Sequence, residues 1–269
     1  MMTRRVVVTA VASFSAFLAH SEVRIELEAR ASTGTLDNRM SYSFTDAAGV
    51  QANGSVSLLG SSAAASADLR AGSLRAFAKA ANDDIGAATT SSAVFADNFE
   101  FSGGYGGTAY LDYVFEGQLD VEANKVNPNT FSYGGMLLYL AYNGTSFNYG
   151  LALAPGDGVC GALNFANSSL GCFTGMSIRT AGSIPIEIGS GSYYFLHQLS
   201  ATATAGDEVN FGNTARFNLR LPDGVSISSS TGEYLTAAAP VPEPETYAML
   251  LVGLGVVGAA VRRRKAKQA

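Results

Sequence analysis

The sequence predicts an all-β body, a jelly-roll-like β-sandwich. Three observations predict it. Apolar and polar residues alternate with a period of two over several long stretches. Residues typical of tight turns separate these stretches. About a dozen short strands can be placed in this way, which is the pattern of a sandwich rather than of a sheet with crossover helices.

The alternation is clearest in three stretches, residues 22–30, 111–122 and 211–221. In the first, Val23 and Ile25 are separated by charged residues such as Arg24. Successive side chains of a strand point to opposite faces, so each stretch places one face in a core and the other in water.

The turn chemistry fits the same fold class. Asn53-Gly54 and Asn143-Gly144 each separate strand-like runs, as two-residue hairpin turns with positive φ require. Pro222-Asp223-Gly224 ends one strand before another begins, and the glycines of residues 103–107 predict a loop between strands. The Ala-rich residues 66–82 favour a hairpin over a helix, because Gly72 interrupts them.

The N-terminus has the parts of a secretory signal peptide over residues 1–21. Arg4-Arg5 precede an apolar run over residues 6–19, and Ala19 and Ser21 supply small residues before the expected cleavage site. The alternatives are a buried helix or an uncleaved anchor. The run is short for a span of about 20 residues, so we expect a mature chain that begins at Glu22.

The C-terminal residues 237–269 read as a linker followed by a sorting tail. Pro240, Pro242 and Pro244 end any preceding element. The apolar residues 247–261 would form a helix of about 22 Å, shorter than a hydrocarbon core of about 30 Å. A basic stop follows over residues 262–267, and its cluster Arg262, Arg263, Arg264 and Lys265 is expected to stay cytoplasmic.

These parts, in this order, resemble the PEP-CTERM sorting signal. The resemblance covers Val241, Pro242, Glu243 and Pro244, the apolar span and the basic stop. It implies processing by an exosortase, a membrane enzyme of Gram-negative bacteria that make exopolysaccharide. The tail would contact the membrane before cleavage near Pro242 to Pro244, and the body would be released or attached at the cell surface. A plain C-terminal membrane anchor is the alternative.

Charge and cysteine content restrict the functions that the body, residues 22–236, can have. The stretch from Glu22 to Pro240 holds 10 basic and 20 acidic residues, a balance of −10 that disfavours nucleic-acid binding. The two cysteines, Cys160 and Cys172, are predicted to form a disulfide, because an exported chain folds in an oxidising compartment. A reactive or metal-binding pair is the alternative.

Motifs for catalysis or cofactor binding are weak. The residues from Gly156 to Gly161 match the glycine spacing of the dinucleotide-binding motif G-x-G-x-x-G, but no helix pattern follows them. His197, the one histidine of the body, lies in a strand-like run and is expected to be structural. Asp120 with Glu122 is expected to be a solvated pair. The acidic or amide segments at Asp83-Asp84 and Asp97-Asn98 lack the ligand spacing of a calcium loop. We therefore predict no catalytic residue, cofactor or metal.

The leading functional hypothesis is an exported, exosortase-processed surface or matrix protein without enzymatic activity, associated with extracellular polysaccharide. The alternative is a carbohydrate-binding module, since tyrosine rings can stack on sugars. It predicts three or more coplanar exposed tyrosines, with these candidates: Tyr105, Tyr110, Tyr113, Tyr133, Tyr139, Tyr142 and Tyr149. A polysaccharide-acting enzyme predicts converging carboxylates in a cleft. A matrix protein predicts a long exposed edge or a uniform polar face.

Overall fold

The computed structural model describes residues 22–32, 37–46, 50–81, 88–103, 106–121, 132–155, 171–204 and 206–235. All of them belong to one compact unit, Met1–Thr236, and the chain divides before Ala237. The signal peptide, the apolar span 247–261 and the basic tail predicted from the sequence lie outside the described residues.

The described residues form β-strands joined by turns and short connections, which confirms the all-β prediction. The strands are β1 (Glu22–Ser32), β2 (Asp37–Asp46), β3 (Gln51–Leu58), β4 (Ser61–Asp68), β5 (Ser73–Lys79), β6 (Ala88–Ser102), β7 (Thr108–Asp120), β8 (Tyr133–Tyr142), β9 (Thr145–Ala154), β10 (Gly171–Thr174), β11 (Ser177–Glu187), β12 (Ser192–Thr204), β13 (Glu208–Arg220) and β14 (Ser226–Ser229).

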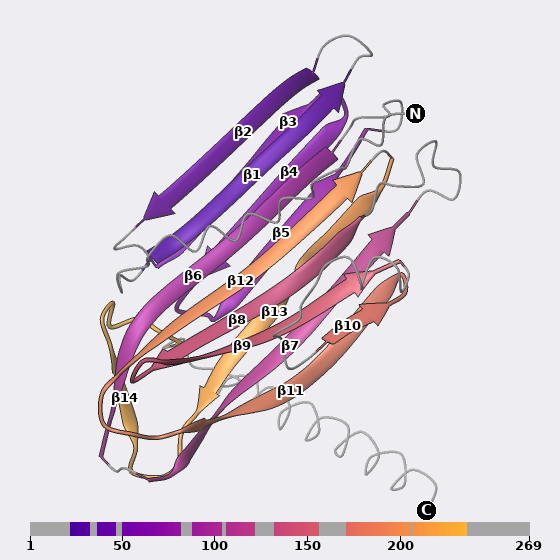
Figure 1. Cartoon of the computed structure of the whole chain (residues 1–269). Coiled ribbons are helices and arrows are strands. Elements are labelled where there is room, and N and C mark those ends of the chain that lie inside the picture. The colour runs from indigo at the N-terminus through magenta and orange to yellow at the C-terminus, as the bar shows by residue number, and fades with distance from the viewer. Residues whose placement is uncertain are drawn as a thin grey trace, which may run out of the picture. The chain divides into compact units, whose positions relative to one another are not determined.

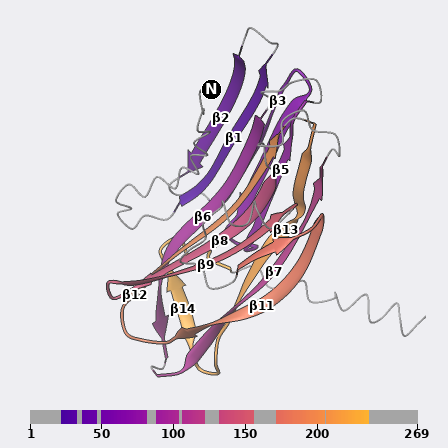
Figure 2. The ribbon, with the colours of Figure 1, turned by 45° about the vertical axis from the view of Figure 1, so that its right-hand side comes forward.

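These strands make two sheets, which can be followed in Figures 1 and 2. Sheet A has the order β10-β9-β8-β12-β6-β1-β2, and β14 also pairs with β6. Sheet B has the order β11-β7-β13-β5-β4-β3. Strands of sheet A contact strands of sheet B along their length, β1 with β4 and β12 with β5 among them. The two sheets are therefore packed face to face.

One hydrophobic core fills the space between the sheets. Val23 and Ile25 of β1, in sheet A, are fully buried, as the alternation predicts, and so are Phe115 of β7 and Phe211 of β13 in sheet B. Phe115 and Phe211 are stacked with their ring centroids 5.0 Å apart. Burying a large apolar side chain stabilises a fold by about 1.5–3 kcal/mol, so these rows hold the two sheets together.

The turns confirm one predicted hairpin signal and correct another. Asn143 and Gly144 form the β8–β9 turn with φ of 47° and 77°, as the sequence predicts. Asn53 and Gly54, however, lie inside β3, and the turn falls at Leu59 and Gly60. Packing explains the glycine at position 54: a Cβ there would lie 2.8 Å from side-chain atoms of both Ile25 and Tyr42.

The remaining turn predictions agree with the structure. Residues 66–82 contain the β4–β5 hairpin rather than a helix. Pro222-Asp223-Gly224 separates β13 from β14, and the glycine-rich residues 103–107 lie between β6 and β7. No helix long and apolar enough to cross a membrane occurs within the part of the chain that the structure describes.

Candidate functional site

All residues singled out in the tail lie outside the described residues. This holds for the sorting residues Val241 to Pro244 and for the basic stop Arg262 to Lys265. Cys172 lies in β10 and is not a free cysteine, whereas Cys160 lies outside the described residues. The disulfide between them stays a prediction.

His197 lies on the core-facing side of β12 and is fully buried. Its ring packs against Phe95 of sheet A and Phe217 of sheet B, with centroid distances of 4.6 and 4.3 Å. Burial lowers the pKa of His197 to about 3, because an imidazolium in this apolar setting would lose its hydration. The ring is therefore neutral at physiological pH.

Tyr234 is the hydrogen-bond partner of His197. Its hydroxyl lies 2.9 Å from Nε2 of His197, and the tyrosine is itself buried. Nδ1 of His197 has no hydrogen-bond partner among the described residues. Burial raises the pKa of Tyr234 well above its usual value, and the charge of Asp97 adds to this effect. The pair is neutral and polar inside an aromatic core.

Tyr234 belongs to the segment Ser229–Leu235, which begins at the last residue of β14 and which we call the C-terminal clasp. The clasp is positioned by β14, which pairs with residues 99–102 of β6. On the same edge of β6, β1 pairs with residues 89–96 but reaches no further than Ala96. Between these two strands the carbonyl of Asn98 accepts a hydrogen bond from the backbone N–H of Ser230.

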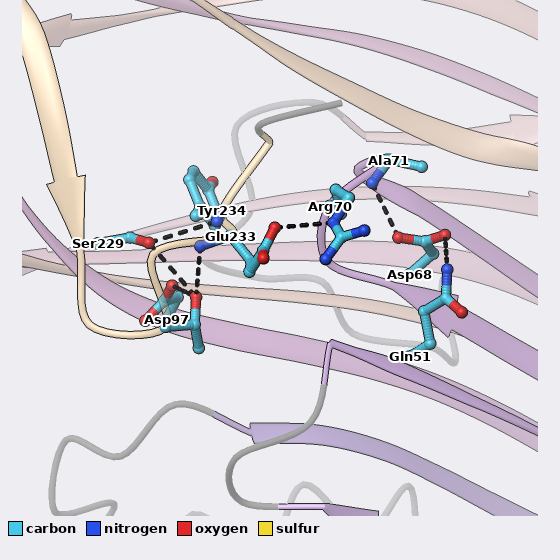
Figure 3. Close-up of polar contacts among 9 residues, drawn as sticks. Gln51, Asp68, Arg70, Ala71, Asp97, Ser229, Glu233 and Tyr234 are labelled. Atoms are coloured by element: carbon cyan, nitrogen blue, oxygen red, sulfur yellow. Dashed lines mark hydrogen bonds and ion pairs between the residues drawn. The ribbon is translucent and has the colours of Figure 1, made fainter. Parts of the chain in front are cut away.

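The carboxylate of Asp97 anchors the clasp to β6 (Figure 3). The hydroxyl of Ser230 donates to Oδ1 of Asp97 at 2.5 Å, and the hydroxyl of Thr231 donates to Oδ2 at 2.6 Å. The backbone N–H of Asn98 also donates to Oδ1 at 2.8 Å. Asp97 is fully buried, so these donors replace the water that a carboxylate would otherwise bind.

The clasp then crosses to sheet B. Arg70 forms an ion pair with Glu233, with 2.7 Å between its Nε and Oε2 of Glu233 (Figure 3). The backbone N–H of Leu235 donates to the carbonyl of Leu69. Asp68 closes the same turn by accepting from the N–H of Ala71. The last described residues of the body are thus bound to both sheets immediately before the predicted linker begins at Ala237.

These contacts give Asp97 of β6 and Glu233 of the clasp structural roles. The sequence analysis considered Asp97-Asn98 as an acidic or amide segment that could bind calcium. Both residues lie inside β6, and the Asp97 carboxylate accepts hydrogen bonds from the hydroxyls of Ser230 and Thr231. No group of three metal-ligating side chains occurs among the described residues. Of the other acidic candidates, Asp120 is exposed at the end of β7, while Glu122, Asp83 and Asp84 lie outside the described residues.

Sequence reasoning missed the clasp altogether, and also a second buried carboxylate. Asp207, between β12 and β13, is fully buried and accepts a short hydrogen bond from the hydroxyl of Ser132. The same hydroxyl lies 3.2 Å from that of Thr204. The run of hydroxyl residues 228–231 is the one sequence signal that points to a partner for the Asp97 carboxylate. Nothing comparable marks Asp207.

The outer face of sheet B carries three adjoining open hollows. One of about 420 Å³ lies over β3, β4 and β5 and is lined by Asn53, Arg75 and Phe77. Two more, of about 400 and 320 Å³, lie over β7, β11 and β13 and share Asn210. The register of β13 shifts after Asn210, whose Oδ1 accepts from the N–H of Gly212. Gly212 of this bulge lines the first hollow, and Asn210 lines the other two.

A second polar group lies on the same face. Arg220 of β13 binds Asp112 of β7 through two nitrogens at 3.1 and 3.2 Å, and Ser183 of β11 also donates to Asp112. The hydrogen bond from Arg220 lowers the pKa of Asp112. The Arg220 guanidinium also covers the ring of Tyr110, 4.7 Å from its centroid.

The described tyrosines do not share one platform. Tyr113 is buried in the core, as its phase predicts, and Tyr142 stacks on Tyr193 with centroids 4.1 Å apart. Tyr139 contacts Tyr194 on the outer side of sheet A. Tyr110 is on sheet B beneath Arg220. These four tyrosines therefore do not form the coplanar exposed surface that a carbohydrate-binding module predicts, and Tyr105 lies outside the described residues.

Comparisons with known proteins bear on the tail. The model of the PEP-CTERM protein-sorting motif matches residues 240–265, so this chain carries that motif, as the resemblance indicates. The motif implies export and exosortase sorting to the surface or the exterior. No curated protein sequence matches the chain.

Among solved structures, the chain is similar to the enzymatically active domain of tailspike protein 4 of bacteriophage CBA120. The identity is 12%, the TM-score is 0.27, and the match covers 64% of this chain and 20% of the tailspike chain. A TM-score this low carries no argument about fold or function.

Proposed function

We propose that this protein is an exosortase-processed, non-enzymatic protein of the cell surface or extracellular matrix that associates with exopolysaccharide. The sorting motif at residues 240–265 is the observation that carries the proposal. It supports export and processing, and the outer face of sheet B supplies a surface on which an extended polysaccharide could lie.

The body is proposed to be a jelly-roll-like β-sandwich. Its two packed sheets support this, as does the path of the chain between them. The chain passes from one sheet to the other between β2 and β3 and at each step from β5 to β8. It does so again at each step from β10 to β14. Frequent exchange between sheets is typical of jelly rolls, in which successive strands alternate between the two layers.

The absence of enzymatic activity is proposed because the reactive groups of the described body serve the fold. His197 is enclosed by aromatic rings and bonded to Tyr234. The hydroxyls of Ser230 and Thr231 are bonded to Asp97. A general base must lie within hydrogen-bond reach of the proton that it removes, and a fully buried histidine has no such access to a polysaccharide.

The polysaccharide surface is proposed to be the three hollows of sheet B. Arg75 is exposed there, Phe77 is half-buried, and Asn53, Gln118 and Asn210 supply amide groups. Amides and guanidinium groups donate and accept hydrogen bonds with sugar hydroxyls, and an aromatic ring can pack on an apolar sugar face. A shallow, open surface suits a long chain that binds at many weak points.

Affinity electrophoresis of the exported protein through gels that contain exopolysaccharide from the producing cells tests this proposal. We expect retardation that rises with polysaccharide concentration, and a dissociation constant at least about tenfold weaker for Arg75→Ala with Phe77→Ala. The matched control is Arg39→Ala with Tyr139→Ala on sheet A, which should leave retardation unchanged.

Two results would contradict parts of the proposal. Equal migration with and without polysaccharide would reject the association. New reducing ends or unsaturated products after incubation of the polysaccharide with the protein would reject the non-enzymatic assignment.

A further inference from the structure

Among the described strands, β2 is the last strand at one edge of sheet A (Figure 1). Its ten residues, Asp37 to Asp46, pair with β1 without a register shift. On its other side no described strand pairs with it. An edge of this kind presents a row of backbone N–H and C=O groups that a further strand can pair with.

The other edge strands carry features that discourage such pairing. At the far edge of sheet A, β10 has four residues. The edges of sheet B are β11, which contains Pro185, and β3, which contains Gly54. Proline cannot donate to a ladder, and glycine weakens a strand. Strand β2 is long and regular and contains neither residue.

A row of large apolar side chains follows β2 on its core-facing side. Met40, Tyr42 and Phe44 are 44%, 41% and 39% exposed. The β1 partners of Met40 and Phe44 are Ala29 and Ile25, which are fully buried. The row therefore continues the hydrophobic core to the edge of the sheet, where it meets water. Three such neighbours on one edge strand mark an interaction surface.

We propose that β2 pairs antiparallel with β2 of a second copy of this chain, with the two-fold axis at Tyr42. In this register Met40 lies opposite Phe44 of the second copy, and Ser41 lies opposite its Ser43. Residues directly opposite in an antiparallel pair point to the same face, so the apolar rows of the two copies join on the core side. The sequence of β2 is thus chemically symmetric about Tyr42, which a two-fold contact requires.

The charges of β2 also fit a second copy. Arg39 lies opposite Thr45 in this register, and its guanidinium already binds Glu28 at 2.5 Å. No like charges face each other between Arg39 and Thr45. Beyond the strand, the body is acidic, with 10 basic and 20 acidic residues between Glu22 and Pro240. Two such bodies repel each other, so added salt should strengthen the contact by screening that repulsion.

The contact is small. One strand pair buries less than the roughly 800 Å² per partner of a stable interface. We therefore expect a reversible dimer that forms at micromolar or higher concentration, as a protein concentrated on a cell surface can reach. This inference does not depend on polysaccharide binding.

Sedimentation velocity over a concentration series of the exported protein tests the pairing. We expect a monomer–dimer equilibrium whose dissociation constant decreases as the salt concentration is raised from 50 to 300 mM. Over this range the Debye length shortens from above to below about 10 Å, so the repulsion between the acidic bodies is screened. In the variant Ser41→Lys with Ser43→Lys, lysines face lysines, and dimerisation should weaken at least about tenfold. Both positions are exposed, so the fold should be kept, and the melting temperature checks this.

Mixing that variant with Ser41→Glu/Ser43→Glu should restore association as a heterodimer, which nonspecific aggregation would not do. The matched control is Ser177→Lys with Ala181→Lys, which places the same charges on exposed positions of β11. A monomer at every concentration, or a dimer that the β2 lysines leave unchanged, would overturn the proposal.

Discussion

The hydroxyl of Tyr234 lies 2.9 Å from Nε2 of His197 and joins the last turn of the body to the centre of sheet A. Tyr234 also stacks on Phe99, with centroids 5.3 Å apart. The C-terminal clasp is therefore part of the core. It ends one residue before the linker that leads to the sorting motif.

Removing the Tyr234 hydroxyl should destabilise the body. Tyr234→Phe keeps the ring contacts but leaves a second nitrogen of His197 without a partner, and the free energy of unfolding should fall by about 1–3 kcal/mol. Urea denaturation measures this. Tyr142→Phe is the control, because that hydroxyl donates to the carbonyl of Ser190 at an exposed site and its loss should cost less. Equal losses in the two variants would contradict the role given to the buried pair.

The buried histidine should make the body less stable in mild acid. The folded-state pKa of His197 is lowered to about 3, whereas an unfolded histidine titrates near its ordinary value of 6.5. The unfolded state therefore binds one more proton as pH falls below 6.5. The stabilisation is fully present above pH 6.5 and is lost progressively as pH falls toward 3, by about 1.4 kcal/mol per pH unit where the difference is a full proton.

Denaturation midpoints between pH 7 and 5 test this dependence before most carboxylates titrate. His197→Gln removes the titrating group, so its stability should change less over the same interval. His197 is the one histidine between Glu22 and Pro240, which makes the comparison clean. A variant with the same pH slope as the natural chain would show that another group is responsible.

Loss of the Asp97 carboxylate should release the C-terminal clasp. Asp97→Ala leaves the hydroxyls of Ser230 and Thr231 without their acceptor, and hydrogen bonds to a charged group contribute about 1.5–3 kcal/mol each. We expect a loss of about 2–3 kcal/mol and new proteolytic cleavage within residues 229–235. Asp112→Ala removes a half-buried carboxylate paired with the exposed Arg220 and should cost less than about 1 kcal/mol. A clasp that stays protected in Asp97→Ala would contradict the anchoring role.

Two glycines from opposite sheets make room for Phe211. A Cβ at Gly134 of β8 would lie 1.8 Å from its ring, and one at Gly117 of β7 would lie 2.1 Å away. Gly134→Ala should therefore destabilise the fold by about 1–3 kcal/mol, as overpacked cores do. Gly107→Ala is the control, because its Cβ would meet neighbours at 3.5 and 3.7 Å, which is ordinary contact. Thermal denaturation of both variants tests whether Gly134→Ala lowers the stability more than Gly107→Ala does.

Local patterns in the sequence predicted much of the body. Val23 and Ile25 are buried because alternation sets which face of a strand meets the core, and Asn143-Gly144 forms its turn because both residues tolerate positive φ. Asn53-Gly54 is the same dipeptide, but its glycine is required by packing and not by a turn, since Gly54 makes room for Tyr42 and Ile25. A local pattern does not distinguish these two uses of glycine.

The clasp could not be predicted for a related reason. Asp97 and Thr231 are 134 positions apart, and their contact depends on which strands flank β6. Strand pairing at that distance leaves no periodic signal in a single sequence. The sorting motif, in contrast, is read along the chain by its order of parts, so the sequence alone was enough to find it.

The intact mass of the exported protein tests the central claim, that the tail is a sorting signal removed from the folded body. The protein should be recovered from both the culture medium and the cell envelope. We predict a chain from about Glu22 to the region of Pro242, two hydrogens lighter than the reduced form because Cys160 and Cys172 are joined. A protein that keeps Arg262 to Lys265 in every fraction would contradict processing and show that the tail is a membrane anchor.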